Sequence, residues 1–250
     1  MKAMILAAGL GMRLRPLTDD RPKALVTVAG RTLLEITLSR LRSFGVHEVI
    51  VNVHHYAGMI CDYLKENNHF GMRIEISPED FLLDTGGGLK HAAWFFFEDR
   101  KSTHEPFILH NVDVLSNIDL GSMVRHHAGE QALATLAVQG RETSRYLLFD
   151  DKAQLCGRQA GRNAQPELVR PAATVQPLAF SGIHVISPRL LEMLSDEGAF
   201  SIITAYLRLA AHGEKITAFR ADESYWRDLG RPENIAQASR DIASGAYPDI

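Results

Sequence analysis

The first half of the chain alternates short apolar runs with longer amphipathic stretches. Residues 1–8 form a mostly apolar run that predicts a buried strand, and EVIVNV at residues 48–53 predicts a second one. Between them, residues 33–44 place their apolar side chains on one face of a helix, and Gly45 follows where a helix-ending glycine is expected. The same patterns predict helices over residues 58–66 and 86–96 and strands over residues 72–76 and 107–109.

These predicted elements follow one another in the order strand, helix, strand, helix, strand, helix, strand. Alternation of this kind is typical of an α/β fold, in which helices cover both faces of a mostly parallel sheet. Binding and chemistry are then expected at the carboxyl ends of the strands.

The second half of the chain has a different pattern, with more strands and fewer helices. Residues 156–177 are polar and contain three prolines, so they predict a loop or an irregular hairpin at the sheet edge, either a lid or a flexible segment. Residues 223–230 have the composition of a turn. Strands are predicted over residues 132–138, 146–149, 179–186 and 216–220, and helices over residues 201–212 and 232–243.

Composition and charge exclude several classes of protein. The chain has 250 residues, of which 46% are hydrophobic, and its net charge of −3 gives no bulk attraction to nucleic acid. The apolar run at residues 3–8 is too short to cross a bilayer, and no cleavage pattern follows it. Cys61 and Cys156 have no metal-ligand spacing and predict no disulfide framework. A cytoplasmic protein with neither a nucleic acid nor a membrane partner is expected, and nothing in the sequence specifies an oligomeric state.

The first predicted strand leads into a loop that is rich in small residues. Its sequence from residue 6 is LAAGLGMRLRPLT, followed by RPK at residues 21–23. Ala8, Gly9 and Gly11 leave the backbone open to close approach by a ligand. Successive backbone N–H groups in such a turn form a concavity that binds anions, although a purely structural turn has the same composition.

Basic residues add fixed positive charge to this loop. Arg13 and Lys23 are candidate phosphate ligands, because a guanidinium can grip phosphate with two hydrogen bonds and an ammonium acts as a point charge. Arg15 and Arg21 are further candidates. The loop matches neither of the two common glycine-rich phosphate motifs, since it lacks the GK[ST] ending and has Leu14 where the dinucleotide motif needs glycine.

The whole string LAAGLGMRLRPLT…RPKAL resembles the signature of the sugar-phosphate nucleotidyltransferases. The resemblance continues through Asp113 and TGGG at residues 85–88 to WRDLG at residues 226–230. Within this family the chain is most similar to the short bacterial N-acetylmuramate 1-phosphate uridylyltransferases. The resemblance implies a Rossmann-like three-layer α/β/α fold with a mostly parallel central mixed sheet.

The same resemblance implies a single nucleotidyltransferase domain over residues 1–250. Its nucleotide-binding half is expected at about residues 1–115 and its sugar-phosphate-binding half at about residues 116–250.

Two aspartates far apart in the sequence are candidate ligands for Mg²⁺. Asp113 follows an apolar run, and Asp228 lies in YWRDLG. Mg²⁺ takes few protein carboxylates and completes its shell with water and substrate phosphates, which two aspartates would suit. Either one could instead be a solvated turn residue, but both match the metal ligands of the family.

The glycine cluster at residues 84–88 allows two interpretations. Asp84 or Thr85 could simply cap a helix. The resemblance implies instead that Gly87 and Gly88 contact the nucleobase, with Ala8 and Gly9 in the same pocket and Glu79 near the nucleoside.

The acceptor site follows the family pattern only in part. The resemblance implies that Asn111, Ser181 and Gly182 bind the sugar phosphate. Many family members also carry a Glu-Lys-Pro element that grips the sugar phosphate, and this chain has none. An arginine of the polar segment at residues 156–177 could replace that lysine; the segment holds Arg158, Arg162 and Arg170.

The implied reaction joins a sugar 1-phosphate to a nucleoside triphosphate, with uridine as the expected base and Mg²⁺ as the cofactor. Arg13 is expected to stabilise the leaving pyrophosphate and Lys23 the α-phosphate region. Alternatives within the class are cytidylyl, guanylyl or thymidylyl transfer to another phosphorylated acceptor. Another alternative is a regulatory subunit that binds nucleotide or sugar without turnover, against which the retained basic and acidic site residues argue.

Overall fold

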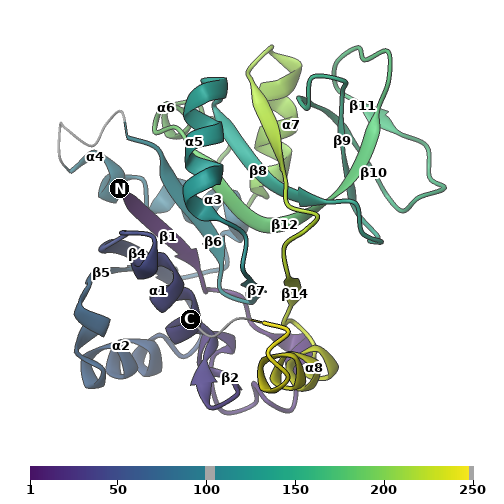
Figure 1. The fold of residues 1–250 in the computed structure, drawn as a ribbon. Coiled ribbons are helices and arrows are strands. Elements are labelled where there is room, and N and C mark those ends of the chain that lie inside the picture. Colours follow the sequence, from purple (N-terminus) through teal and green to yellow (C-terminus); the bar gives the residue numbers. More distant parts are fainter. Residues whose placement is uncertain (99–104, 248–250) are drawn as a thin grey trace.

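A mixed β-sheet crosses the centre of the molecule (Figure 1). The computed structural model describes residues 1–98 and 105–247. The main path of the sheet is β11-β10-β9-β12-β6-β1-β4-β5, and β13 joins it through β8, which pairs with β12. These strands are β1 (Lys2–Leu6), β4 (Glu48–Val53), β5 (Arg73–Pro78), β6 (Phe107–Asn111), β8 (Ala134–Gln139), β9 (Tyr146–Phe149), β10 (Leu155–Gln159), β11 (Glu167–Leu168), β12 (Gln176–Ile186) and β13 (Ile216–Arg220).

The strands of the first half are parallel, as the alternating pattern predicted. β1 lies between β4 and β6, and its last residue, Leu6, pairs with Asn52 on one side and Asn111 on the other. The carboxyl ends of three strands therefore meet at one edge of the sheet. All five residues of β1 are buried, which explains why the four residues that follow Lys2 are all apolar rather than alternating.

Helices cover both faces of this sheet and complete three layers. Ala3 and Ile5 of β1 point into one hydrophobic core, whereas Met4 and Leu6 point into the other. The first core is covered by α1 (Leu33–Ser43), α2 (Ala57–Glu66), α5 (Leu120–Glu130) and α8 (Pro232–Ala243). The second is covered by α3 (Asp84–His91), α4 (Trp94–Phe97), α6 (Arg189–Glu192) and α7 (Ile202–Ala211). The predicted α/β/α architecture is confirmed.

The predicted helix over residues 86–96 is in fact two helices, α3 and α4. Between them the backbone hydrogen bonds span three residues instead of the four of an α-helix, as in the bond from Ala93 N–H to the Lys90 carbonyl. This tighter turn allows the buried rings of Phe95 and Phe96 to enter the second core.

The second half of the sheet is antiparallel. β12 is its longest member and pairs with β6, β8 and β9, all antiparallel. Residues 156–177 form the predicted irregular hairpin at the sheet edge, where β10 pairs with β11. Helix α5 lies where the sequence pattern predicted no element. Its apolar stripe is short, and its start depends on the Asp119 side chain, which accepts a hydrogen bond from Ser122 N–H at 2.9 Å.

The segment predicted as a turn at residues 223–230 contains a strand. β14 (Trp226–Asp228) pairs antiparallel with β7 (Val114–Ser116) in a separate two-stranded ribbon. The following helix α8 packs beside the hairpin of β2 (Thr27–Val28) and β3 (Arg31–Thr32). Helix α8 thereby lies beside elements formed by the first 32 residues (Figure 1).

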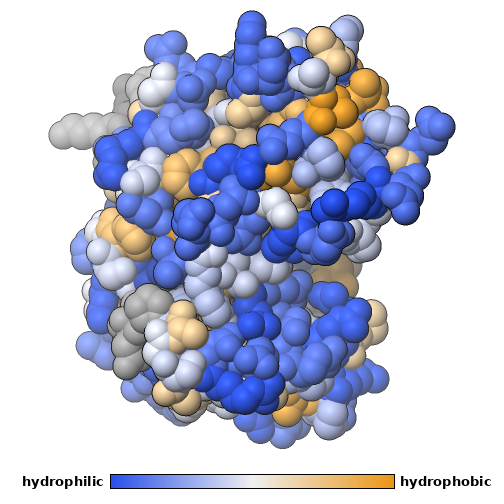
Figure 2. Space-filling model, turned by 45° about the vertical axis from the view of Figure 1, so that its right-hand side comes forward, coloured by the Kyte–Doolittle hydropathy of each residue, from blue (hydrophilic) through white to orange (hydrophobic). Residues whose placement is uncertain are grey.

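Three 3-10 helices complete the list of elements: η1 (Met12–Leu14), η2 (Lys23–Leu25) and η3 (Asn68–Gly71). Hydrophilic residues dominate the face in Figure 2, with hydrophobic ones gathered mainly in its upper part. Across the described ranges, no helix combines the length and apolar character that a membrane crossing needs.

Three buried histidines lie among the strands and helices of the core. Burial lowers the pKa of His110 to about 4, of His184 to about 3 and of His127 to about 4, from an ordinary value of 6.5. The His184 ring bonds the Tyr206 hydroxyl at 2.9 Å, and the His127 ring bonds Thr135 and Ser187 hydroxyls, both at 3.0 Å. All three rings are therefore neutral in the folded protein at neutral pH.

Acidification should destabilise the fold between about pH 6.5 and pH 4. In the unfolded chain each histidine binds a proton near its ordinary pKa of 6.5, whereas the folded chain keeps it neutral down to about 4. Each of the three should therefore lower the free energy of unfolding by about 1.4 kcal/mol per pH unit within this window. Urea denaturation at a series of pH values measures the slope.

His127→Gln should reduce that slope, and His212→Gln provides the control because His212 is exposed at the end of α7. An unfolding free energy that does not change from about pH 7 to pH 5 would contradict the prediction.

Candidate active site

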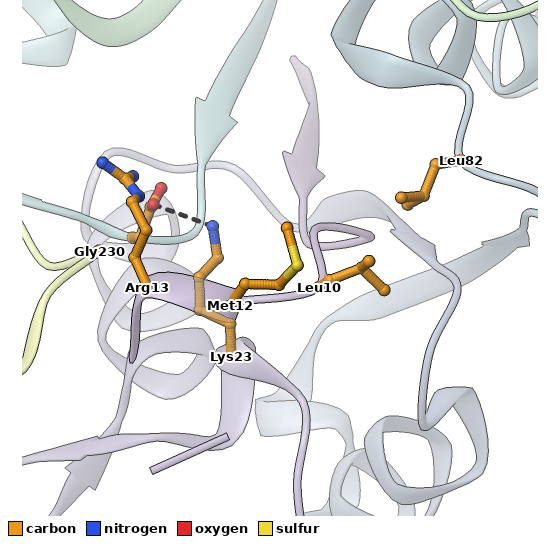
Figure 3. A pocket seen from close by; sticks show the side chains of 8 residues that line it. Leu10, Met12, Arg13, Lys23, Leu82 and Gly230 are labelled. Atoms are coloured by element: carbon orange, nitrogen blue, oxygen red, sulfur yellow. Dashed lines mark hydrogen bonds and ion pairs between the residues drawn. The ribbon is translucent and has the colours of Figure 1, made fainter. Parts of the chain in front are cut away.

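Two adjoining hollows open at the carboxyl ends of β1, β4 and β6. Their volumes are about 320 and 450 Å³, and both are lined by Lys23, Leu82 and Asp113, so they form one cleft. The first is also lined by Leu10, Gly11, Met12, Arg13 and Gly230 (Figure 3). The second is also lined by Leu6, Ala8, Gly9, Asn52, Glu79, Asp84, Thr85 and Asn111.

The loop after β1 is held in one conformation by its own contacts. Gly11 has a φ of 67°, which favours glycine, and a Cβ there would lie 3.0 Å from Thr18 Cγ2 and 3.2 Å from Lys23 Cβ. The Thr18 hydroxyl donates to the Gly11 carbonyl at 2.9 Å, and Leu14 is fully buried. The loop therefore presents Arg13 and Lys23 side by side at the cleft (Figure 3).

An ion pair joins this loop to the end of β6. Lys23 Nζ lies 2.9 Å from Asp113 Oδ2, and each side chain is only 14% exposed. Burial would raise the pKa of Asp113, but the charge and hydrogen bond of Lys23 outweigh it and hold that pKa below its ordinary value. The carboxylate is thus kept charged at the base of the cleft.

Asp228 is brought to the same place by the β7–β14 ribbon. It pairs with Val114, and the next residue, Leu229, donates its N–H to the Asp113 carbonyl at 2.7 Å. Gly230 N–H donates to Asp228 Oδ1 at 2.6 Å. A Cβ on Gly230 would lie 2.7 Å from both Arg13 Nη2 and Asp228 Oδ1, so the Arg13 guanidinium passes close to this turn.

The two aspartates are candidate metal ligands with few other ligands nearby. Across the described residues, no group of three or more His, Cys, Asp or Glu side chains could hold a metal ion. Two carboxylates, beside a loop that carries two cations and can bind phosphates, would suit Mg²⁺ better than a metal that needs a full protein shell, because Mg²⁺ keeps water and binds substrate phosphates.

The side of the cleft lined by β4 is built around a buried polar network that includes Asn52. Its Oδ1 accepts a hydrogen bond from Ala7 N–H at 2.7 Å, and its Nδ2 donates to Glu79 Oε1 at 2.7 Å. Glu79 Oε2 accepts from Leu83 N–H at 3.0 Å. Glu79 lines the cleft as expected, but both carboxylate oxygens already bind protein groups. Asn52 was not among the predicted site residues, although it is the one polar residue inside an apolar strand.

Gly87 and Gly88 were predicted to contact the base, and the structure places them behind the wall of the cleft. A Cβ on Gly87 would lie 2.4 Å from the Gly198 carbonyl oxygen. A Cβ on Gly88 would lie 2.7 Å from Glu79 Oε1 and 2.8 Å from Asn52 Nδ2. Both glycines therefore permit close packing of protein groups, and neither lines the hollows.

Asp84 and Thr85 line the cleft in place of these glycines. Leu83 occupies the N-cap position of α3 and makes no side-chain cap, whereas Asp84 Oδ1 accepts a hydrogen bond from the Thr85 N–H of the first turn at 2.6 Å. The Thr85 hydroxyl instead accepts from Ile202 N–H at 3.0 Å and so supports the start of α7.

The predicted acceptor residues meet at an irregularity in β12. The pairing of β12 with β8 shifts register between Phe180 and His184, which frees the backbone around Ser181. Gly182 has a φ of 76°, and a Cβ there would lie 2.9 Å from Asn111 Nδ2. Asn111 in turn lines the cleft. Asn111, Ser181 and Gly182, which were predicted to bind the sugar phosphate, are thus neighbours in the fold.

Side chains from two other segments satisfy the freed carbonyls. Trp226 Nε1 donates to the Ser181 carbonyl and Arg141 Nη2 to the Phe180 carbonyl, both at 2.7 Å. Burial lowers the pKa of Arg141 to about 10, and the nearby Asp228 carboxylate opposes that shift. Arg141 was not predicted as a site residue.

The three arginines of the polar segment are occupied elsewhere. Arg158 pairs with Glu167 at 2.7 Å, Arg162 with Glu142 at 2.5 Å and Arg170 with Asp150 at 2.7 Å. Their partners hold the edge hairpin and its neighbours together, so the structure does not bring these arginines to the cleft.

Comparisons with known proteins agree with this geometry. Residues 2–245 match the nucleotidyl transferase family. Two similar relatives are named N-acetylmuramate alpha-1-phosphate uridylyltransferase. The one from Caulobacter vibrioides is 36% identical, with 96% of each chain covered, and the one from Neisseria meningitidis serogroup B is 42% identical, with 95% of this chain and 96% of the relative covered.

A similar solved structure is that of HddC from Yersinia pseudotuberculosis in complex with GMP-PN. Its TM-score is 0.75 at 22% identity, with 96% of this chain and 99% of HddC covered. At this level of identity the likeness establishes the fold alone.

Gly88→Ala should destabilise the protein by about 1–3 kcal/mol, because the added methyl group forces Asn52 and Glu79 apart in a packed interior. Gly129→Ala is the matched control. Gly129 lies in α5 with no atom within 4 Å of its would-be Cβ, so alanine there should stabilise the helix by about 0.5–1 kcal/mol. Urea denaturation of both variants measures the two effects, and equal stability of the pair would show that the space around Gly88 is not tight.

Proposed function

The chain belongs to the nucleotidyl transferase family and is a sugar-phosphate nucleotidyltransferase, and from that premise we propose that it joins UTP to N-acetylmuramate 1-phosphate. The products would be the uridine diphosphate sugar and pyrophosphate. Residues 1–115 would bind mainly the nucleotide, and residues 116–250 would contribute the acceptor site and the second aspartate.

The observation that carries this proposal is the convergence of four charged side chains on one cleft. Arg13 and Lys23 come from the loop after β1, Asp113 from the end of β6, and Asp228 from β14. Two cations beside two carboxylates suit a reaction in which two substrates meet through their phosphates. Asp113 and Asp228 would hold a metal ion, which would supply positive charge next to those phosphates.

The reaction is a displacement at phosphorus. An oxygen of the sugar 1-phosphate attacks the α-phosphorus of the triphosphate and forms a new P–O bond, while the bond from the α-phosphorus to the bridging oxygen breaks. The electron pair of that bond leaves with pyrophosphate. The attacking oxygen is already anionic, so no general base is needed, and alignment and charge stabilisation supply most of the catalysis.

The two cations of the loop after β1 would stabilise different parts of the reacting triphosphate. Arg13 is exposed at the first hollow, next to Gly230, where its guanidinium can bind the departing pyrophosphate. Lys23 lies at the junction of the two hollows, where its ammonium can bind the α-phosphate.

Asp113 and Asp228 would hold Mg²⁺. When bound, this ion supplies positive charge that offsets the repulsion between the phosphates of the two substrates. Lys23 stabilises the charged form of Asp113 before any substrate binds, so the carboxylate is ready to accept a cation.

The choice of substrates rests on the two relatives of 36 and 42% identity, each matched over 96% of its own length. A uridine diphosphate derivative of N-acetylmuramate is a building block of the cell wall, and UTP is a cytoplasmic substrate. We therefore include a cytoplasmic role in cell-wall sugar metabolism in the proposal.

A matrix of substrates tests the function. The purified protein is given each of the four common ribonucleoside triphosphates, and dTTP, with N-acetylmuramate 1-phosphate, glucose 1-phosphate, mannose 1-phosphate and phosphocholine, and pyrophosphate release is measured. We expect the fastest release with UTP and N-acetylmuramate 1-phosphate, and its loss when EDTA removes divalent cations. Faster release with CTP or GTP would replace the uridine assignment, and nucleotide binding without release under any condition would favour a regulatory subunit.

Asp113→Asn and Arg13→Ala should each lower kcat by about 100-fold or more, since each removes charge that acts on the transferred or leaving phosphates. Asp151→Asn is the control, because Asp151 is exposed in the turn after β9 and lines neither hollow. Circular dichroism checks that each variant is folded. Wild-type turnover in Asp113→Asn would contradict the proposal that Asp113 is a metal ligand.

A further inference from the structure

The Arg141 guanidinium is held by contacts other than a direct ion pair. Its central carbon lies 3.5 Å from the centroid of the Trp226 ring, and Nη2 donates to the Phe180 carbonyl at 2.7 Å. Nε is buried without a hydrogen-bond partner, and no carboxylate in the described part of the chain lies within 4.0 Å of the group. The side chain is therefore held in place by stacking and a single carbonyl, and the Asp228 carboxylate acts on its charge from beyond ion-pair distance.

Three other partly buried arginines form direct ion pairs. Arg227 lies 2.7 Å from Asp241, Arg208 lies 2.7 Å from Asp196, and Arg170 lies 2.7 Å from Asp150. The buried Arg40 resembles Arg141 in donating to a backbone carbonyl, that of Ile118, with no carboxylate of the described residues in direct contact. Taking a charge out of water without a direct counter-ion is costly, so the Arg141 guanidinium would gain from contact with an anionic ligand.

Arg141 lies near Asp228, because both are connected through strand β14. Trp226 and Asp228 are two residues apart in β14, so their side chains project from the same side of the strand, about 7 Å apart. Arg227 lies between them and points the other way, toward Asp241. The guanidinium stacked on Trp226 is thus on the Asp228 side of the strand.

The same guanidinium is linked to the acceptor residues. It binds Phe180, Trp226 binds Ser181, and the next residue, Gly182, lies against Asn111, which lines the cleft. This continuous set of contacts leads from Arg141 to the part of the site assigned to the sugar phosphate.

We propose that Arg141 binds an anionic group of the acceptor, either its 1-phosphate or a carboxylate carried by the sugar. This proposal rests on the proposed function and names the residue that takes the place of the lysine missing from the polar segment. Stacking on Trp226 fixes the plane of the guanidinium, and its N–H groups match the two oxygens of a phosphate or carboxylate.

Steady-state kinetics of Arg141→Gln and Arg141→Lys test the proposal, with Arg158→Gln as the control because Arg158 is exposed and paired with Glu167. Two acceptors are used, N-acetylmuramate 1-phosphate and N-acetylglucosamine 1-phosphate, which differ by the lactyl ether that carries the carboxylate. Arg141→Gln should raise the acceptor KM about tenfold or more and leave the KM for UTP unchanged, because a lost charged hydrogen bond weakens binding by that order. Arg141→Lys should recover part of the loss.

The pattern across the two acceptors identifies the group that is bound. A rise in KM for both acceptors assigns Arg141 to the phosphate, and a rise only for the N-acetylmuramate compound assigns it to the carboxylate. An acceptor KM within twofold of wild type would overturn the proposal. So would equal impairment of the Gln and Lys variants together with a lower kcat and a higher KM for UTP, which would indicate a purely structural role.

Direct binding separates this proposal from the proposed function. If wild-type protein releases no pyrophosphate with either acceptor, the proposed function fails, and isothermal titration of each acceptor then tests Arg141 alone. Weaker binding to Arg141→Gln than to wild type supports the proposal. Equal binding to the two proteins, or none to wild type, rejects it.

Discussion

The pairing of β14 with β7 is the interaction on which the site depends. Without it, Asp113 and Asp228 would be separated by 115 positions of chain (228 − 113) with nothing to bring them together. The bond from Leu229 N–H to the Asp113 carbonyl, at 2.7 Å, places the second carboxylate beside the first. The same ribbon orients Trp226, whose ring supports Arg141 and whose N–H binds the backbone of β12. One short strand pair thus links the two aspartates proposed to hold the metal ion to the residues proposed to bind the acceptor.

Charge balance explains how the cleft can exist before substrates arrive. Asp113 is largely buried, and a lone carboxylate there would be strongly destabilising. Lys23 removes that penalty, and the loop that carries Lys23 is itself held by Gly11, Thr18 and Leu14. Arg13 stays exposed at the cleft. In the absence of substrate, Lys23 is therefore paired with Asp113 while Arg13 stays free to bind an anion. This arrangement suits a site that binds polyanionic substrates.

Much of the fold and part of the site follow from local sequence patterns. β1, α1, β4, β9, β13 and α8 lie within a few residues of their predicted limits, because each has a clear apolar period or a clear end signal. Helix α5 was missed because its apolar stripe is short, and β14 was taken for a turn because three residues have no period of their own. The role of Gly87 and Gly88 was predicted from resemblance, and only packing shows that Asn52, Glu79 and the Gly198 carbonyl occupy the space beside them.

The amino-acid sequence by itself determined the local backbone and the chemistry available to it: a buried strand, a glycine-containing turn, and two cations in the loop that follows. Short-range sterics and solvation act between near neighbours, so these features can be predicted from the sequence alone. Tertiary structure decided which distant groups meet. It paired Lys23 with Asp113, joined Asp228 to them through β7, engaged Arg158 of the polar segment in an ion pair at the sheet edge, and stacked Arg141 on Trp226. Those outcomes depend on strand order and register, which no local pattern specifies.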